Sequence, residues 1–143
     1  MAIAPRQGAS SHQPGNNPRR LALEILVRVE RDRAYANLLL DIQLRRQRLP
    51  PLDRALATEL CYGVLRHRGT IDFLLCKVLD RPLEAVDVEV RNLLRLGAYQ
   101  LFYLTKIPTY AAVHETVRLA RRGTRTFVNA ILRALERRGP LRE

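Results

Sequence analysis

The stretch from Asp87 to Thr105 places the strongest constraint on what this chain can fold into. Apolar side chains surround the whole stretch, and the only polar residues that interrupt its hydrophobic part are Arg91, Asn92, Arg95 and Gln100. A helix that is apolar on every side has to be covered by other elements, so it belongs at the centre of a bundle. Gly97 costs about 1 kcal/mol of helix propensity there, which predicts that another backbone passes close by.

Amphipathic segments flank this central helix on both sides. Asn17 and Pro18 predict a capped start for a first helix that reaches about residue 32. Apolar residues at helical spacing predict five more helices, with breaks at Pro50-Pro51, near Gly69 and at Gly123. The residues expected to face the core include Leu38, Ile42 and Leu52. No segment shows the period-2 alternation of a strand bounded by turn residues. The prediction is therefore an all-α fold, a compact bundle of about seven helices around the buried helix 87–105.

The chain is 143 residues long and is expected to form one domain. Residues 1–16 have no apolar period and predict a flexible tail, residues 17–139 the helical domain, and residues 140–143 a C-terminal tail. Cys61 and Cys76 have no partner at metal-ligand spacing, which predicts two buried thiols that act as small hydrophobes. No apolar run reaches the roughly 18 residues of a membrane span, and no secretory signal opens the chain. A cytoplasmic protein without a membrane partner is expected.

The charge of the chain is strongly unbalanced. Twenty-five Lys and Arg residues face 14 Asp and Glu residues, for a formal net charge of +11. Such a surplus favours a polyanionic partner, because contacts to phosphates release condensed counterions. The surplus is almost entirely arginine, whose planar fork suits phosphates and bases. Two alternatives stay open: high charge can simply maintain solubility, and genomic base composition can favour Arg over Lys.

A basic patch is predicted near the C-terminal end. Arg118, Arg121 and Arg122 would share one face of the sixth helix, and Arg125 would continue the pattern after Gly123. With residues near the N-terminus and on the last helix, the predicted RNA-binding set is Arg19, Arg20, Arg118, Arg121, Arg122, Arg125, Phe127 and Arg133. The alternative for any single arginine is a solvated surface residue.

The sequence shows no constellation of catalytic residues. His114 and Glu115 are adjacent, and adjacent residues on a helix point about 100° apart. The motifs for zinc peptidases, dinucleotides and nucleotide phosphates are absent. We therefore expect no catalytic residue, no metal and no cofactor, and a chain that is not an enzyme by itself.

Two segments carry a resemblance to a known family. IPTYAAVHETVRLARRGTRTFVNAILRAL (107–135) resembles the closing signature of the NusB family, and LLRLGAYQLFYL (93–104) resembles its central buried helix. The resemblance runs from about Pro18 to Arg138 and implies an all-helical RNA-binding domain. Phe127 occupies the position at which the antitermination factors of this family stack an aromatic ring on RNA. The alternative is that Phe127 packs in the core.

The family has two branches, and this chain is more similar to one of them. NPRRLALEILVRVERDRAYANLLLD (17–41) and LDRALATELCYGVLRHRGTIDFLL (52–75) resemble the N-terminal domain of RsmB-type 16S rRNA cytosine-5 methyltransferases. This resemblance implies an accessory domain that binds rRNA, with a C-terminal methyltransferase domain as its partner beyond Glu143.

The other branch, the antitermination factors, implies a leader RNA and a ribosomal protein as partners. The chain departs from that branch at His114 and at GTRT (123–126). A third hypothesis is a protein-interaction module whose basic face docks an acidic domain.

Overall fold

The computed structural model describes residues 17–139, and all regular secondary structure in this range is helical. The elements are α2 (Pro18–Asp32), α3 (Ala36–Arg46), α4 (Pro51–Arg66), α5 (Arg68–Val78), η2 (Leu83–Ala85), α6 (Val88–Tyr103), α7 (Thr109–Val117), η3 (Arg122–Thr124) and α8 (Arg125–Arg138), where η marks a short 3₁₀ turn. The seven α-helices of this range confirm the predicted all-α fold. The tails predicted for residues 1–16 and 140–143 lie outside the described residues.

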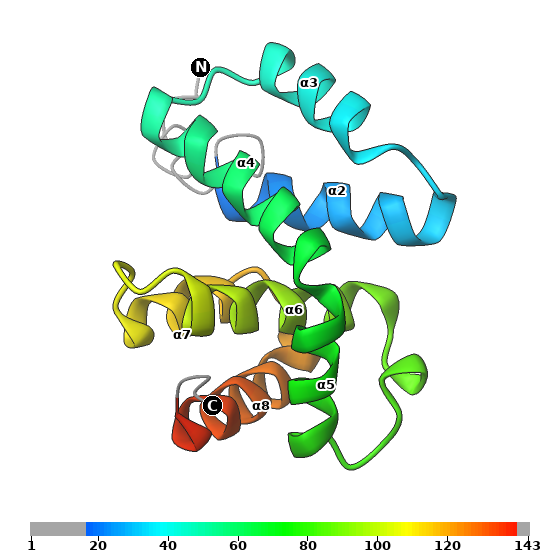
Figure 1. Ribbon diagram of the computed structural model, residues 1–143, viewed down its shortest axis with the longest axis vertical. Helices are drawn as coiled ribbons and strands as arrows, with labels where there is room; N and C mark the ends of the chain where they lie inside the picture. Colours follow the sequence, from blue (N-terminus) through cyan, green and yellow to red (C-terminus); the bar gives the residue numbers. More distant parts are fainter. Residues whose placement is uncertain (1–16, 140–143) are drawn as a thin grey trace, which may run out of the picture.

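α6 is the central helix that the sequence predicts. Every residue from Asn92 to Gln100 is buried, and the helix contacts α2, α4, α5, α7 and α8. Figure 1 shows α2, α3 and α4 together on one side of α6, with α8 on the other. The two groups of helices therefore share α6, and together they cover its apolar surface.

The helix boundaries follow local chemistry at most positions. The Asn17 side-chain oxygen accepts hydrogen bonds from the backbone N–H groups of Arg19, at 2.8 Å, and Arg20, at 3.1 Å, which confirms the predicted N-cap. The break at Pro50-Pro51 is also confirmed, because α3 ends at Arg46 and α4 begins at Pro51. The break expected near Gly69 lies instead at His67, and Gly69 belongs to the first turn of α5.

The sixth predicted helix ends earlier than expected. α7 stops at Val117, and Gly123 lies in the 3₁₀ turn η3 rather than at a helix end. The Arg125 side chain donates hydrogen bonds to the carbonyl oxygens of Ala120, at 2.9 Å, and Arg118, at 3.2 Å. These bonds satisfy carbonyls that a continued helix would have satisfied. The prediction of one helix face shared by Arg118, Arg121 and Arg122 is therefore wrong.

Some residues expected in the core are exposed. Leu52 is 84% exposed, and Leu38 and Ile42 on α3 are 56% and 44% exposed. α3 contacts α2 and α4 through Leu39 and Leu40, which are buried, so its other face stays open. Periodicity correctly predicts that Leu39 is buried, but it does not show that Leu38 and Ile42 face away from α2 and α4.

The two cysteines and Gly97 differ in part from prediction. Cys61 is buried, and burial raises the pKa of its thiol to about 12. Cys76 is exposed on α5, contrary to the predicted burial. At Gly97 the close neighbour is a side chain rather than a backbone, because an added Cβ would lie 2.6 Å from Cδ1 of Leu132 on α8.

Candidate nucleic-acid interface

Arg19 and Arg20 begin α2 and face different surroundings. The Arg19 Nε donates a hydrogen bond of 2.7 Å to Oε1 of Gln100, which is fully buried in α6. The Gln100 amide donates in turn to Oγ1 of Thr116 on α7, at 2.9 Å. Burial lowers the pKa of Arg19 below its usual value. Arg19 therefore joins three helices, and its cation is partly withdrawn from solvent.

Arg20 reaches the connection between α7 and α8. Its Nη2 lies 3.4 Å from the carbonyl oxygen of Leu119 and donates to it. Residues that are 99 positions apart in the sequence are thereby neighbours. The N-terminal and C-terminal basic segments of the prediction meet at this contact.

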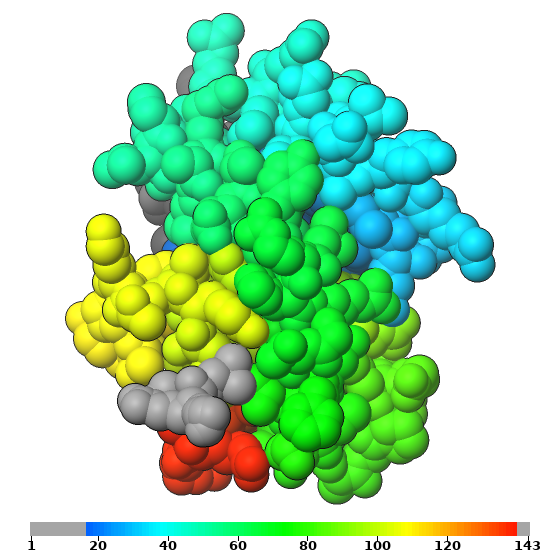
Figure 2. Space-filling view, viewed as in Figure 1, coloured from blue at the N-terminus to red at the C-terminus, as the bar shows by residue number. Residues whose placement is uncertain are grey.

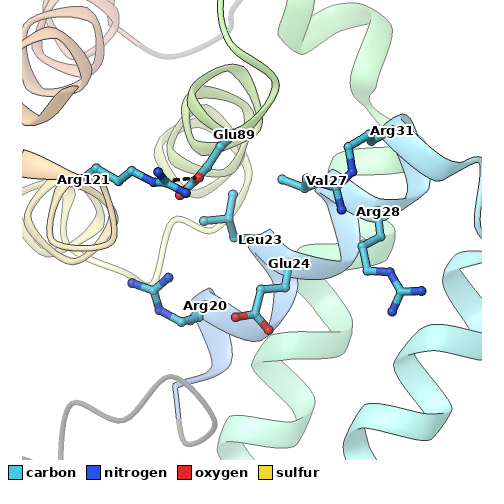
Figure 3. A pocket seen from close by; sticks show the side chains of 8 residues that line it. All are labelled: Arg20, Leu23, Glu24, Val27, Arg28, Arg31, Glu89 and Arg121. Carbon is cyan, nitrogen blue, oxygen red and sulfur yellow. Dashed lines mark ion pairs between the residues drawn. The ribbon is translucent and has the colours of Figure 1, made fainter. Parts of the chain in front are cut away.

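A groove with basic walls lies beside this contact (Figure 3). It has a volume of about 370 Å³, and its charged lining residues are Arg20, Glu24, Arg28, Arg31, Glu89 and Arg121. Figure 3 shows Arg20 and Arg121 at one end, Arg28 and Arg31 at the other, and Leu23 and Val27 between them. A second hollow of about 380 Å³ adjoins it and shares Arg31, Glu89 and Arg121. We call these two hollows the arginine groove.

The charges of the arginine groove are only partly balanced. Its first hollow carries four arginines against two glutamates. Arg121 Nε lies 3.3 Å from Oε1 of Glu89, yet the Arg121 side chain is 82% exposed. Burial raises the pKa of Glu24, and the charge of Glu89 adds to this while Arg20 opposes it. Arg31 and Arg121, which are exposed, and Arg20, which is partly buried, therefore line one concave surface. Such an arrangement suits phosphate oxygens.

Sequence reasoning missed two members of the groove, Arg28 and Arg31. A signal was available, because Arg20, Glu24, Arg28 and Arg31 stand at i, i+4, i+8 and i+11 on one helix and so share a face. Both arginines lie close to the Asp32 carboxylate, at 3.7 Å and 3.2 Å. Such exposed pairs contribute little energy, so an external anion can compete for these arginines.

The other predicted arginines lie outside the groove lining. The Arg125 guanidinium donates hydrogen bonds to backbone carbonyls of the α7–α8 connection. Arg118 Nη1 lies 3.5 Å from Oε1 of Glu115, and Arg122 is exposed in η3. Arg133 pairs with Glu136 on α8 at 3.0 Å. Of the predicted set, the structure brings Arg20 and Arg121 into one lining, with Arg19 beside them.

Arg91 and Arg95 belong to a separate network, which is partly buried. Arg95 is 3% exposed, and its guanidinium donates to both carboxylate oxygens of Asp72, at 2.8 Å and 3.1 Å. It also donates to Glu30 at 3.0 Å, and Arg91 donates to the same carboxylate at 2.8 Å. Asn92 donates to Glu30 at 2.9 Å. We call these five residues the α6 network; it ties α2, α5 and α6 together.

Residues 17–139 contain no group of three or more His, Cys, Asp or Glu side chains that could hold a metal ion. In the same range, no helix has both the length and the apolar character needed to cross a bilayer. His114 is exposed on α7.

Comparison with protein families gives a clear match. The model of the NusB family matches residues 16–137. The chain belongs to the NusB family.

The NusB-family relatives include methyltransferases that are much longer than this chain. The chain is 41% identical over 125 residues to a probable ribosomal RNA small subunit methyltransferase B of Bacillus subtilis, covering 85% of this chain and 28% of that protein. It is 46% identical over 121 residues to the Thermus thermophilus ribosomal RNA small subunit methyltransferase B, covering 82% of this chain and 29% of that protein. The chain thus spans less than a third of the length of these relatives.

Solved structures share the fold at lower identity. Thermotoga maritima NusB aligns with a TM-score of 0.75 and 24% identity, over 84% of this chain and 88% of that one. A chain in the crystal structure of antitermination factors NusB and NusE with dsRNA aligns with a TM-score of 0.75 and 22% identity, over 90% of this chain and 98% of that one. These likenesses show that the NusB fold is present.

The segments that resemble the family lie on α6, α7 and α8. Phe127, at the start of α8, is half-buried and packs against the core. The Arg81 guanidinium carbon lies 5.0 Å from the centre of its ring. The ring therefore already has a core contact and a cation beside it, while part of it remains accessible. Phe127 lies outside the lining of the arginine groove.

Proposed function

We propose that this chain is an RNA-binding domain that serves as an accessory domain of a small-subunit rRNA methyltransferase. Its role is to hold rRNA while a separate catalytic domain performs the methyl transfer. The arginine groove is the observation that carries the proposal. The identity of 41% and 46% to the methyltransferases, against 24% and 22% to the NusB structures, favours this branch of the family.

The groove would act on the RNA backbone rather than on base edges. Arg20, Arg31 and Arg121 come from two separate segments, so a curved strand of phosphates could contact them together. Each phosphate that they neutralise releases condensed counterions, and this release supplies affinity without sequence information. Exposed guanidinium groups also bind phosphate oxygens in two places at once.

The salt dependence of RNA binding tests this proposal. We expect log K for a duplex fragment of small-subunit rRNA to fall linearly with log salt, by about 0.9 per phosphate contact. The double variant Arg20→Glu, Arg121→Glu should bind more weakly and show a smaller slope. Arg46→Glu is the matched control, because Arg46 is an exposed arginine at the end of α3. A loss in Arg46→Glu as large as that in the double variant would contradict a specific groove.

The accessory role needs a test in a full-length enzyme. In the Thermus thermophilus relative, deletion of the matching domain should weaken rRNA binding while the isolated domain still binds RNA. Unchanged affinity of the truncated enzyme would overturn the accessory role. Arg125 is unsuitable for charge reversal, because loss of its side chain would disturb the α7–α8 connection.

The second candidate is a NusB-type antitermination factor. It is favoured by the match to a chain in the crystal structure of NusB and NusE with dsRNA, which covers 98% of that chain. This role predicts that the domain captures a ribosomal protein in a pull-down and prefers a leader RNA over bulk rRNA. Binding of rRNA without either property would favour the methyltransferase role.

A further inference from the structure

We propose that a second surface, along α4, binds unpaired RNA nucleotides by stacking. This proposal rests on the proposed function in so far as both require RNA. It concerns a different site, however, because the two surfaces share no lining residue. The ligand also differs: the α4 surface would contact the exposed bases of single strands, whereas the arginine groove would contact phosphates.

The surface consists of two adjoining hollows with volumes of about 540 Å³ and 650 Å³. Both are lined by Ala55 and Glu59 of α4, so they form one continuous depression, which we call the α4 groove. The first continues along α4 to Arg66, and the second continues to the α6–α7 connection, residues 104–108. Figure 2 shows the α4 atoms, in green, bordering those of this connection, in yellow.

Aromatic rings stand at both parts of the α4 groove. Tyr62 lines the first hollow and Tyr103 the second, and both are half-buried. His67 stacks on Tyr103 with the ring centres 4.1 Å apart and the planes 18° apart. Tyr99 stacks on Tyr103 from α6, at 5.2 Å. A base that stacked on the accessible part of these rings would extend an aromatic cluster already present.

Within the aromatic cluster of His67, Tyr99 and Tyr103, the position of Tyr99 is fixed by its surroundings. Tyr99 is buried and its hydroxyl donates a hydrogen bond to Oε2 of Glu59. Burial raises the pKa of Tyr99 to about 12, so the hydroxyl keeps its proton at neutral pH. Gly63 makes room for this ring, because an added Cβ would lie 2.0 Å from Cζ of Tyr99. Stacking on a ring that is already fixed costs less conformational entropy than stacking on a mobile one.

The polar groups of the α4 groove match a nucleotide. Three exposed cations line it, Arg54, Arg66 and Lys106, against the single carboxylate of Glu59. Tyr99 occupies one oxygen of that carboxylate, which leaves Oε1 as an acceptor for a base N–H group. An anionic ligand with a flat apolar face and hydrogen-bond donors is an unpaired nucleotide. Bases within a duplex do not present their faces, and their Watson–Crick donors are already paired.

Affinity for short RNA measures the stacking directly. Tyr103→Ala should weaken binding of hexacytidylate and hexauridylate by about tenfold or more, as expected for the loss of one stacked base. Tyr103→Phe keeps the ring and should bind like the native chain. Lys106→Glu should lower the slope of log K against log salt by about 0.7. All three variants should bind an rRNA duplex unchanged, because the arginine groove is untouched.

The absence of Trp from the chain offers a second measurement that does not depend on affinity. Tyr103→Trp introduces one fluorophore into the α4 groove, and a stacked base should quench its emission. Tyr35→Trp is the control, because Tyr35 is 73% exposed outside this groove and should respond little. Circular dichroism would show whether Tyr103→Ala folds. If it does not, Lys106→Glu and the quenching experiment still test whether the α4 groove binds unpaired nucleotides.

The outcomes separate this inference from the proposed function. Duplex binding that depends on Arg20 and Arg121, together with single-strand binding that ignores Tyr103 and Lys106, overturns only the α4 groove. Unquenched emission from Tyr103→Trp at saturating hexacytidylate does the same. A native chain that binds neither form of RNA overturns both proposals.

Discussion

The α6 network and the arginine groove both contain arginine side chains, but these differ in exposure and in partners. In the network, the Arg95 side chain is 4% exposed and its fork is filled by the carboxylates of Asp72 and Glu30. In the groove, the Arg121 side chain is 82% exposed and approaches a single carboxylate, that of Glu89. The first arrangement satisfies buried charge within the fold, whereas the second leaves donors for an outside anion. The net charge of the chain therefore does not measure its binding surface.

Alanine substitutions at Arg95 and at Arg121 should show the largest difference in stability. Arg95→Ala removes the main partner of the Asp72 carboxylate, which is 27% exposed and keeps Arg68 at 3.7 Å. The loss should therefore be about 3 kcal/mol, at the lower end of the range for a buried pair. Arg121→Ala should change the free energy of unfolding by less than about 0.5 kcal/mol. Urea denaturation of both variants measures the difference. Similar losses in the two would remove the distinction between network and groove.

Arg19 stands between the two regions and should show an intermediate effect. Arg19→Ala leaves the buried Oε1 of Gln100 without its donor, which costs about 1–3 kcal/mol. Thermal unfolding measures this loss, and Arg19→Lys, which keeps a donor and the charge, should recover part of it. A variant Arg19→Ala with native stability but weakened RNA binding would instead place Arg19 in the groove.

Glu30 of the α6 network and Glu24 of the arginine groove should make stability depend on pH in opposite directions. Burial acts to raise the pKa of Glu30, but hydrogen bonds from Asn92 and Arg91 and the nearby arginine charges outweigh it, so the pKa lies below the usual 4.5. The folded chain therefore binds this proton more weakly than the unfolded chain does. The stabilisation from Glu30 is complete above about pH 4.5 and is lost as the pH falls through the lowered pKa. Glu30→Gln should flatten this loss in urea titrations at acid pH.

Glu24 in the arginine groove should behave in the reverse sense. Its pKa is raised, mainly by burial, so its stabilising protonated form is lost as the pH rises through that value. Glu24→Gln should therefore leave the chain as stable or slightly more stable at neutral pH, and it should strengthen RNA binding by removing a negative charge from the groove. Lower stability at pH 7 in this variant would contradict the assignment.

At Arg31 the expected effect on stability is as small as that at Arg121. Arg31→Ala removes an exposed contact to Asp32 and should change the free energy of unfolding by less than about 0.5 kcal/mol. The same variant should lower the salt slope of duplex binding by about 0.9 if Arg31 contacts one phosphate. An unchanged slope would limit the groove to its other end, at Arg20 and Arg121.

The sequence alone determined the fold class and the central helix. An apolar surface on all sides of residues 93–104 permits burial at the centre of a bundle and little else. Asn17 and the Pro50-Pro51 pair fixed helix ends, because capping and the loss of a backbone donor are local effects. The family followed from the order of motifs along 107–135.

Only the tertiary structure decided which arginines lie side by side. Residue spacing predicted a helical face for Arg118, Arg121 and Arg122, but the side chain of Arg125 stabilises a different turn there. The contact of Arg20 with the Leu119 carbonyl joins segments 99 residues apart, and no local pattern encodes it. The burial of Arg95 likewise depends on carboxylates that two other helices supply. Periodicity reports how a side chain points from its own helix, whereas its partner depends on which helices pack together.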